Sequence, residues 1–521
     1  MRFFALSEDL KLKFSTCRNG KNYEVKTYTS PMALKNWFFD CIRKFGEIIP
    51  LDEKLEKEVE VASVFKSPEN IFLNVFGMND PSHLEKIPKR TLRLSHCSFL
   101  VPDTLFSFKD FLPAQVDLVS THFEMERIKI CLGKAAPEIG VFTPKVDTDF
   151  FCLPDKRQRL IAREKKGLSK DQIHVVYAGR WIATKGIPQL IRALDIWPLP
   201  RVVVTLVGNF EPKFSIQHAV GNHLTFANFL KQEFLSQISR DWLCFQPTKK
   251  PEALRELFWS ADLFVNPSIH SDENFGITPR EAASCGVPVI TTNFCGLRPL
   301  ANNMPWGGVN TYPTIHGSRF SLRQFHRLFS RAISECKSYP PQEYRKAILK
   351  ECNLQISQND LVRAIQLLRK FPLKSYEEIK NIKQNFKQKV FLEANEKIVK
   401  DFFISKKDIP QWCYMYGSGP SHPGFKSLQG IYSAIEEPPK VERGSSWRGF
   451  FRIGFWEEER TLIEFGFPGP RMHRYKDKSW DTLIACSHPA EINEWIIIPE
   501  NKEQVSIVQE LVDYGYLIPD D

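Results

Sequence analysis

The sequence predicts an α/β fold built around a doubly wound parallel sheet. Between about residues 173 and 333, short valine-rich runs alternate with segments of helical periodicity. The apolar runs do not alternate with polar residues, which is typical of strands that helices cover on both faces. The chain has 521 residues, whereas single cores stop growing at roughly 250–300 residues. More than one domain is therefore expected.

The order of these elements indicates where a ligand would bind. HVVYAGR and RVVVTLVGN are expected to be strands, and IPQLIRALD between them a helix, which makes a βαβ unit. Helices are also expected at PEALRELFWS and PREAASCG. Ligands of doubly wound sheets bind beyond the carboxyl ends of the strands, so the loops after the strands are the candidate sites. The expected strands are 174–180, 201–209, 241–247, 261–268 and 288–293.

The amino-terminal part of the chain has a less regular pattern. Strands are predicted at 70–77, 91–101 and 116–122, and a helix near ALKNWFFDCIRKFG. These elements favour a second α/β domain over residues 1–145.

The carboxyl-terminal part has yet another character. From SLRQFHRLFSRAIS onward the periodicity is helical, and it changes again after about Pro410. WRGFFRIGFWEEERTLIEFGFPGP predicts a hairpin with glutamates at its tip, and Asn501 is expected to start a helix with Gln504 three residues on. An appended α+β module is therefore expected at the end of the chain.

The charge balance leaves several partners open. The net charge of +10, from 71 basic and 61 acidic residues, suits nucleic acid, an anionic membrane or phosphorylated small molecules. A basic cluster between Lys156 and Lys166 is interleaved with leucine and isoleucine at helical spacing, so it is expected to be the solvated face of a helix. No nucleic-acid-binding module has a signature here, and nucleic acid is not an expected partner.

The cysteines and the hydropathy predict a cytoplasmic protein. The 12 cysteines include no C-x-x-C pair, which disfavours a zinc ribbon, a redox pair or a disulfide scaffold. No apolar run reaches the roughly 18–20 residues that span a bilayer, and the first apolar stretch is interrupted at Ser7. The surplus positive charge also allows a peripheral contact with a membrane.

The first candidate loop is YAGRWIATKG, which follows a predicted strand and opens a helix. Gly179 and Gly186 let the backbone turn and approach a ligand. Arg180 and Lys185 place two cations beside the amino end of the next helix, which suits a diphosphate. The alternative is that both are ordinary loop charges.

The second candidate loop is SDENFGITPREAASCG, again between a strand and a helix. Glu273 and Glu281 lie eight residues apart, and an acidic side chain there could hold vicinal hydroxyls, as in dinucleotide sites. A local explanation also exists for Glu281. Thr278 as N-cap with Glu281 three residues later would form a capping box, and Gly286 would end the helix.

Taken together, the two loops resemble the donor half of the retaining glycosyltransferases of family 4, which have the GT-B fold. The E-x(7)-E pattern of that family is met by Glu273 and Glu281, and its G-R-x(4)-K-G pattern by residues 179–186. VFTPKVDTDFF resembles the segment that joins the two domains of the family. The resemblance implies two Rossmann-like doubly wound domains with a cleft between them. The expected ranges are 1–145 for the acceptor side, 146–335 for the nucleotide-sugar-binding domain, 336–405 for a helical connection and 406–521 for the appended module.

The resemblance implies a sugar transfer from a nucleotide-sugar donor, with retention of configuration and without a metal or other cofactor. Arg180 and Lys185 would neutralise the donor diphosphate, and Glu281 would bind the ribose hydroxyls. Glu273 would face the transferred sugar. The acceptor would be a glycan, a lipid-linked molecule or a small molecule. Further donor contacts are expected from Gly179, Asn274, Phe275, Gly276, Ile277 and Thr278.

Some features depart from the family pattern. The first domain lacks the glycine-rich loop that many members have after the opening strand. His96 falls where the family often has a histidine near the sugar, and His122 is a second candidate. Either histidine could instead be structural. The module has aromatic residues that could stack on sugars but that are also typical of a core. They are Trp447, Phe451, Phe455, Trp456, Trp480 and Trp495.

Two other functions remain open at the level of sequence. One is a synthase or phosphorylase of related architecture that acts on a storage glucan or a phosphorylated sugar. The other is a degenerate protein that binds a nucleotide-sugar or a glycan without turning it over. A nicotinamide enzyme is disfavoured because no G-x-G-x-x-G follows a predicted strand.

Overall fold

A computed structural model shows two compact units, which we describe one at a time. The first comprises Met1–Asp147 and Ile348–Ile404, and the second Thr148–Ala347 and Ser405–Asp521. The structure describes residues 1–6, 14–18, 21–25, 30–51, 67, 69–75, 89–94, 116–122, 125, 138–181, 185–208, 243–247, 249–269, 273, 275–314, 317–370, 378, 439–464, 471–490 and 494–520.

The first unit is built on a six-stranded parallel sheet in the order β4-β1-β5-β6-β7-β8. The expected strands near residues 70, 91 and 116 are confirmed as β5, β6 and β7. Strands β1 and β4 are further members, and β2 and β3 form an antiparallel hairpin. The strands are β1 (Arg2–Leu6), β2 (Phe14–Arg18), β3 (Lys21–Val25), β4 (Glu47–Leu51), β5 (Asn70–Val75), β6 (Arg90–Leu94), β7 (Val116–Val119) and β8 (Ile139–Val141).

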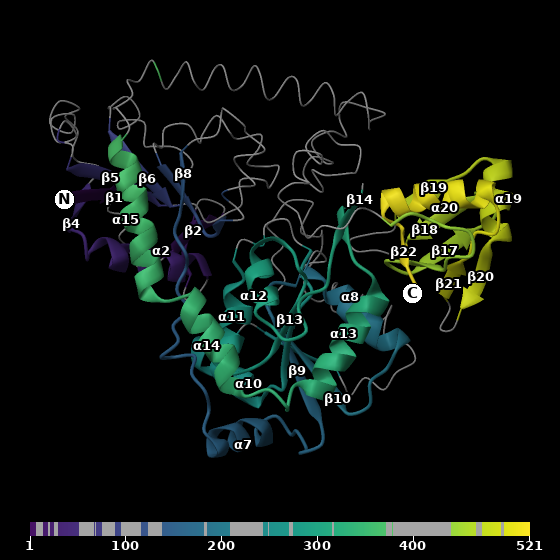
Figure 1. Cartoon of the computed structure of the whole chain (residues 1–521), viewed down its shortest axis with the longest axis horizontal. Coiled ribbons are helices and arrows are strands. Elements are labelled where there is room, and N and C mark those ends of the chain that lie inside the picture. The colour runs from purple at the N-terminus through teal and green to yellow at the C-terminus, as the bar shows by residue number, and fades with distance from the viewer. Residues whose placement is uncertain are drawn as a thin grey trace. The chain divides into compact units, whose positions relative to one another are not determined.

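Two helices that are far apart in the sequence share the core of this unit. They are α2 (Ser30–Ile42) and α15 (Leu354–Lys370), and α15 lies along the sheet in Figure 1. Trp37 Nε1 donates to Ser357 Oγ at 2.9 Å, and Asp360 accepts from the Thr143 hydroxyl at 2.7 Å. Within the helical connection expected at 336–405, α15 therefore does more than connect, because its apolar residues belong to the core of the first unit.

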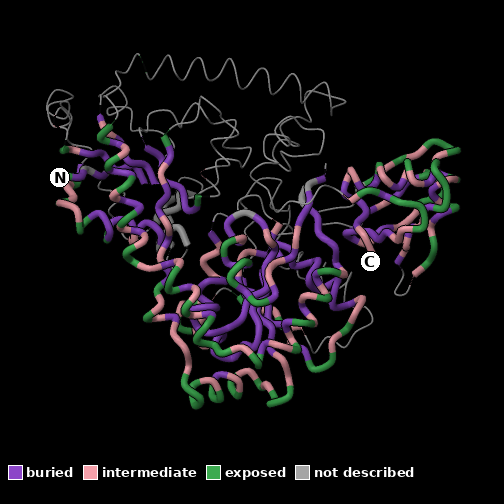
Figure 2. Tube along the Cα trace, viewed as in Figure 1, coloured by how far each residue is buried: buried purple, intermediate pink, exposed green. Residues whose placement is uncertain are grey.

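The second unit contains the parallel sheet that the sequence predicts, in the order β11-β10-β9-β12-β13. The chain runs outward from β9 to β11 and returns to start β12 on the other side of β9, so the topological switch point lies between β9 and β12. Figure 2 shows buried strands at the centre of the unit. The strands are β9 (Ile173–Ala178), β10 (Val202–Val207), β11 (Leu243–Gln246), β12 (Leu263–Asn266) and β13 (Val289–Thr291).

Helices surround this sheet, and the expected ones are confirmed as α8, α10 and α11. A short antiparallel ribbon, β14 (Tyr312–Thr314) and β15 (Gly317–Arg319), follows β13. The helices are α7 (Lys156–Glu164), α8 (Ile187–Ile196), α10 (Pro251–Ser260), α11 (Ile277–Ser284), the 3₁₀ turn η6 (Cys295–Leu297), α12 (Arg298–Asn302), α13 (Leu322–Glu335) and α14 (Pro341–Glu351).

The carboxyl-terminal residues 439–520, here called the C-terminal module, form an α+β structure within the second unit. The expected hairpin is confirmed as β17 and β18, and the Asn501 side chain caps α20 by accepting from the Gln504 amide at 3.0 Å. The elements are β16 (Trp447–Gly449), β17 (Ile453–Trp456), β18 (Thr461–Glu464), β19 (Arg471–Arg474), α19 (Asp477–Ala485), β20 (Ser487–Ala490), β21 (Glu494–Ile497), α20 (Lys502–Tyr514) and β22 (Leu517–Pro519).

Most of the aromatic residues noted in this module form its core. Trp447, Phe451 and Trp480 are buried, and the Phe455 ring packs edge-on against Trp495 at 4.9 Å. Trp456 is 44% exposed. No helix among the described residues is long and apolar enough to cross a membrane.

Candidate functional site

The two candidate loops lie on either side of the switch point of the second sheet. Strands β9 and β12 are parallel neighbours, with Val176 opposite Phe264, so both end at the same edge. Gly179 and Arg180 directly follow β9, and Glu273 lies in the loop that follows β12. Ligands of doubly wound folds bind at this edge and at this point of the strand order.

Gly186 brings the first loop close to the second. Its φ is +73°, in the left-handed region, and a Cβ there would overlap the carbonyl oxygen of Pro267. Only glycine meets both conditions without strain. Because Gly186 is also the N-cap of α8, the amino end of that helix lies beside Pro267, the residue that follows β12.

Lys185 and Glu273 form an ion pair across the two loops, in which Lys185 Nζ donates to Glu273 Oε2. Each side chain is only 10% exposed. The sequence predicted both residues in one site, and the structure brings them together. A partly buried ammonium of this kind is held by its carboxylate partner, and removing either partner would leave a charge in a poorly solvated place.

Arg280 is a residue of this loop that the sequence analysis missed. Its guanidinium is fully buried and stacks on the Phe275 ring at 4.0 Å. It donates to the carbonyl oxygens of Phe275, Gly276 and Gly296. A carbonyl held on one side turns the amide N–H of the same peptide to the other side, so Arg280 fixes the orientation of the loop backbone. The sequence signal that could have revealed Arg280 is a charged residue within a helix that is predicted to pack on a sheet.

The capping box expected at Thr278 is wrong. Helix α11 begins at Ile277, and its N-cap is Gly276, with φ 73° and no side-chain cap. The reason is tertiary, because a Cβ at Gly276 would overlap the Leu297 side chain. Glu281 is buried in the middle of α11, so capping does not explain its residue type.

The expected end of α11 at Gly286 is confirmed. Gly286 has φ +78°, its amide donates to Ala283 O at 2.9 Å, and the Val287 amide donates to Ala282 O at 3.1 Å. This is the Schellman arrangement that glycine favours.

Two hydrogen bonds hold the backbone around Gly179 and Arg180 in place. The Tyr177 hydroxyl donates to Arg180 O at 2.9 Å, and the Gly179 amide donates to Val207 O at 2.9 Å. Burial raises the pKa of Tyr177, and the Glu273 carboxylate raises it further, so the phenol stays a hydrogen-bond donor at neutral pH. Arg180 is half-buried.

Several candidates stay predictions. His96 and Asn274 lie outside the described residues. His122 is exposed in the first unit. Ile277 and Thr278 form the first turn of α11, and Phe275 is buried beside it. Among the described residues, no group of three or more His, Cys, Asp or Glu side chains could hold a metal ion.

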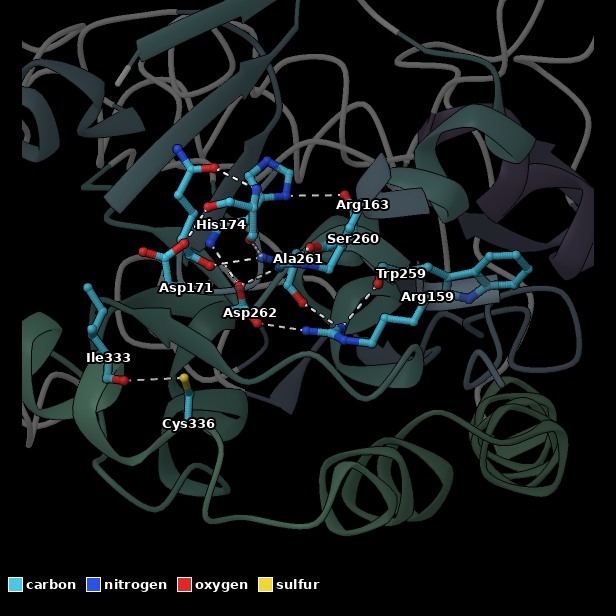
Figure 3. A network of polar contacts seen from close by, with 12 residues as sticks. Arg159, Arg163, Asp171, His174, Trp259, Ser260, Ala261, Asp262, Ile333 and Cys336 are labelled. Atoms are coloured by element: carbon cyan, nitrogen blue, oxygen red, sulfur yellow. Dashed lines mark hydrogen bonds and ion pairs between the residues drawn. The ribbon is translucent and has the colours of Figure 1, made fainter. Parts of the chain in front are cut away.

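The opposite edge of the same sheet carries a different cluster, which Figure 3 shows. Asp262, just before β12, accepts from Arg159 Nη2 at 2.7 Å and from Arg163 Nη1 at 2.8 Å. The backbone amide of His174 donates to Asp262 Oδ2 at 2.8 Å. The expectation that the basic cluster of α7 is only a solvated face is therefore wrong for two of its members, because they clamp α7 to the amino ends of β9 and β12.

Comparisons with solved structures agree with this architecture. Sucrose-phosphate synthase from Thermosynechococcus elongatus has a TM-score of 0.51 and 17% identity, over 71% of this chain and 99% of that one. Anabaena Alr3699/HepE in complex with UDP has a TM-score of 0.51 and 13% identity, over 70% and 99%. With the two parallel-sheet units, this likeness gives the chain the GT-B fold of glycosyltransferases.

A family model matches part of the second unit. Residues 158–304 match the family described as Glycosyl transferases group 1. A relative described as D-inositol 3-phosphate glycosyltransferase, from Paenarthrobacter aurescens, is 27% identical over 191 residues, 36% of this chain and 40% of the relative. One of the same description from Mycobacterium sp. (strain KMS) is 34% identical over 185 residues, 35% and 38% respectively. The matches span less than half of these relatives.

Proposed function

We propose that this chain is a retaining glycosyltransferase of family 4 type, which moves a sugar from a nucleoside-diphosphate-sugar donor to a hydroxyl of an acceptor. The family match of residues 158–304 supports the class of reaction. A solved structure of the same fold, from Anabaena, holds UDP, which supports the kind of donor. The acceptor is a glycan, a lipid-linked molecule or a small molecule.

The observation that carries the proposal is the meeting of Lys185 and Glu273 at the switch point, beside the amino end of α8. In the proposed complex the donor diphosphate lies at that helix end, where backbone N–H groups and the helix dipole favour an anion. Lys185 and Arg180 add two positive charges. Glu281 holds the ribose hydroxyls.

The charges suit the breaking of a bond between sugar and phosphate. As this bond breaks, negative charge grows on the leaving diphosphate, and fixed cations stabilise that charge more in the transition state than in the ground state. A carboxylate only accepts hydrogen bonds, so Glu273 would accept from hydroxyls of the transferred sugar while its other oxygen keeps Lys185 in place.

The same cations make a resident metal or cofactor unnecessary in this proposal. Lys185 and Arg180 supply the countercharge that a divalent ion supplies in other enzymes. We therefore expect transfer to persist in the presence of EDTA. Loss of activity on chelation, with recovery on adding Mg²⁺ or Mn²⁺, would contradict this part of the proposal.

A panel of nucleoside diphosphates and nucleotide-sugars tests the donor site. The expected result is that one base raises the melting temperature, and that the matching nucleotide-sugar is slowly hydrolysed without acceptor. Glu281→Ala should remove the stabilisation, because the ribose loses its acceptor. Glu256→Ala is the matched control, since Glu256 pairs with Lys165 at 3.0 Å on the surface of the same unit.

The outcomes separate the proposal from its rivals. The donor site is refuted if no nucleotide stabilises the chain and Lys185→Ala and Glu281→Ala change nothing. Stabilisation without hydrolysis, with or without acceptors, would indicate a protein that binds a nucleotide-sugar without turning it over. Consumption of inorganic phosphate with a glucan would indicate a phosphorylase.

A further inference from the structure

Helix α8 is buried on all of its faces, which is unusual for a helix that covers a parallel sheet. Such helices normally keep one polar face in water. Gln189, Arg192 and Asp195 lie three residues apart and so share one stripe of the helix. Their exposed fractions are 1%, 3% and 5%. A polar stripe of this kind must be covered by another part of the molecule.

The C-terminal module supplies that cover through a chain of alternating charges. Arg192 Nη2 donates to Glu494 Oε1 at 2.7 Å, and Arg448 Nη1 donates to Glu494 Oε2 at 2.5 Å. Arg448 Nε in turn donates to Asp520 Oδ1 at 2.6 Å. Glu494 begins β21 and is buried between the two guanidinium groups. It therefore joins α8 to the module at one point.

The charge chain continues to the end of α8. Trp197 is the C-cap of this helix, and its ring lies 5.2 Å from Arg448 Cζ and 4.5 Å from Arg323 Cζ. Arg323 Nε, on α13, also donates to the Asp520 carbonyl oxygen at 2.6 Å. The module therefore holds α8 over its last two turns.

A second contact fixes how the module is seated. Arg319 Nε donates to Gly515 O at 2.9 Å, and the rings of Phe320 and Phe450 meet edge-on at 5.6 Å. Gly515 has φ +86°, and a Cβ there would overlap the Thr314 hydroxyl. A close-packed contact of this kind does not slide, because its neighbours have no space to move into.

The other end of α8 is the candidate donor site. Lys185 precedes Gly186, the N-cap, and Arg192 lies about two turns further along, roughly 10 Å at 1.5 Å per residue. A helix transmits a displacement along its axis as a rigid element. A shift of about 1 Å at a reacting group can cost up to about a hundredfold in rate.

We propose that the C-terminal module is an internal brace for α8, and that Arg192 and Glu494 are positioning residues which set where Lys185 and the amino end of α8 stand relative to Glu273. This inference rests on the proposed donor site for its functional part. Its structural part, the hold of Glu494 on α8, can be tested without any ligand.

The test compares Glu494→Gln with Glu503→Gln in the full chain. Both remove one carboxylate from the module, but Glu503 pairs with Lys478 on the surface, at 3.0 Å. We expect faster amide hydrogen exchange in the first turn of α8 in Glu494→Gln, for example at Leu190, whose amide donates to Gly186 O at 3.0 Å. We also expect UDP affinity to fall about fivefold. Glu503→Gln should match wild type in both.

The double variant Arg192→Met/Glu494→Gln distinguishes positioning from a general loss of stability. If Glu494 acts through Arg192, UDP binds the double variant no more weakly than it binds either single variant. Because Arg192 and Glu494 are replaced together, neither is left as a buried charge without the other, so the double variant also serves if Glu494→Gln does not fold.

Unchanged hydrogen exchange in α8 of Glu494→Gln overturns the brace, whatever the ligand results. Faster exchange with unchanged UDP affinity overturns its role in positioning Lys185. If wild type binds no nucleoside diphosphate, the proposed function fails, and hydrogen exchange alone still decides whether the module holds α8.

Discussion

The two edges of the second sheet use charge in opposite ways. At the amino edge, Asp262 is surrounded by donors from Arg159, Arg163 and the His174 backbone, which hold α7 against β9 and β12. At the carboxyl edge, Lys185 meets Glu273 beside glycine-rich loops. The first cluster has one carboxylate fully occupied by its own protein. The second has a cation and an anion that, in the proposed complex, contact the diphosphate and the sugar of the donor.

Asp262→Ala should weaken the contact of α7 with the amino edge of the sheet and leave the candidate site at the carboxyl edge intact. The variant leaves Arg159 and Arg163 without their carboxylate partner, and the Arg163 side chain is only 12% exposed, so the free energy of unfolding should fall by about 4 kcal/mol. Urea unfolding measures this, and UDP affinity at low temperature should stay at the wild-type value. Glu256→Ala, which breaks the exposed Lys165 pair, should cost less than about 1 kcal/mol. A large loss of UDP affinity in folded Asp262→Ala would show that the two edges are coupled.

Lys185→Ala should instead impair the candidate site at the carboxyl edge. Turnover should fall by about 10²–10³-fold, because a fixed cation is lost from the leaving diphosphate, whereas UDP affinity should fall by only about tenfold. Steady-state kinetics and calorimetry measure the two quantities, with Lys165→Ala as control. An equal loss in both would assign Lys185 to donor binding alone.

The pH dependence of stability should come in part from the amino edge. Burial lowers the pKa of His174 from 6.5 to about 4, so the folded state binds its proton less readily than the unfolded state. The contribution of neutral His174 to the free energy of unfolding is fully present above pH 6.5. It is lost as the pH falls toward 4, by up to about 3 kcal/mol. His174→Gln should flatten this slope in unfolding curves taken between pH 7 and 4. An unchanged slope would mean that other groups carry it.

Arg280→Lys tests whether the candidate site at the carboxyl edge depends on the Arg280 guanidinium. Lysine keeps the charge but cannot hold three carbonyl groups in a planar fork, so UDP affinity should fall by roughly tenfold and stability by about 2 kcal/mol. Arg345→Lys is the matched control, since Arg345 donates to Phe151 O, Ser284 O and Thr148 O. It should lose similar stability and keep its UDP affinity. The same loss of affinity in both variants would contradict a specific role for Arg280.

The sequence predicts best those structural features that are encoded by residues close together in the chain. The alternation of strands and helices in the second unit, the hairpin of the module and the cap at Asn501 are all local patterns, and all are confirmed. The first unit was predicted less completely. Strands β1 (Arg2–Leu6) and β4 (Glu47–Leu51) were not predicted, and their neighbours in the sheet are distant in sequence.

The sequence alone predicts that the second sheet carries Arg180, Lys185 and Glu273 on two loops and Glu281 on the helix after the second loop, because strand order and turn residues are encoded in contiguous segments. Which distant residues contact one another depends instead on the tertiary fold. The N-cap at Gly276, the grip of Arg280 and the bond between Arg192 and Glu494 depend on close approach of distant segments. The last of these joins residues 302 positions apart, and such partners are chosen by packing and by the need to pair buried charge, neither of which has a local signature.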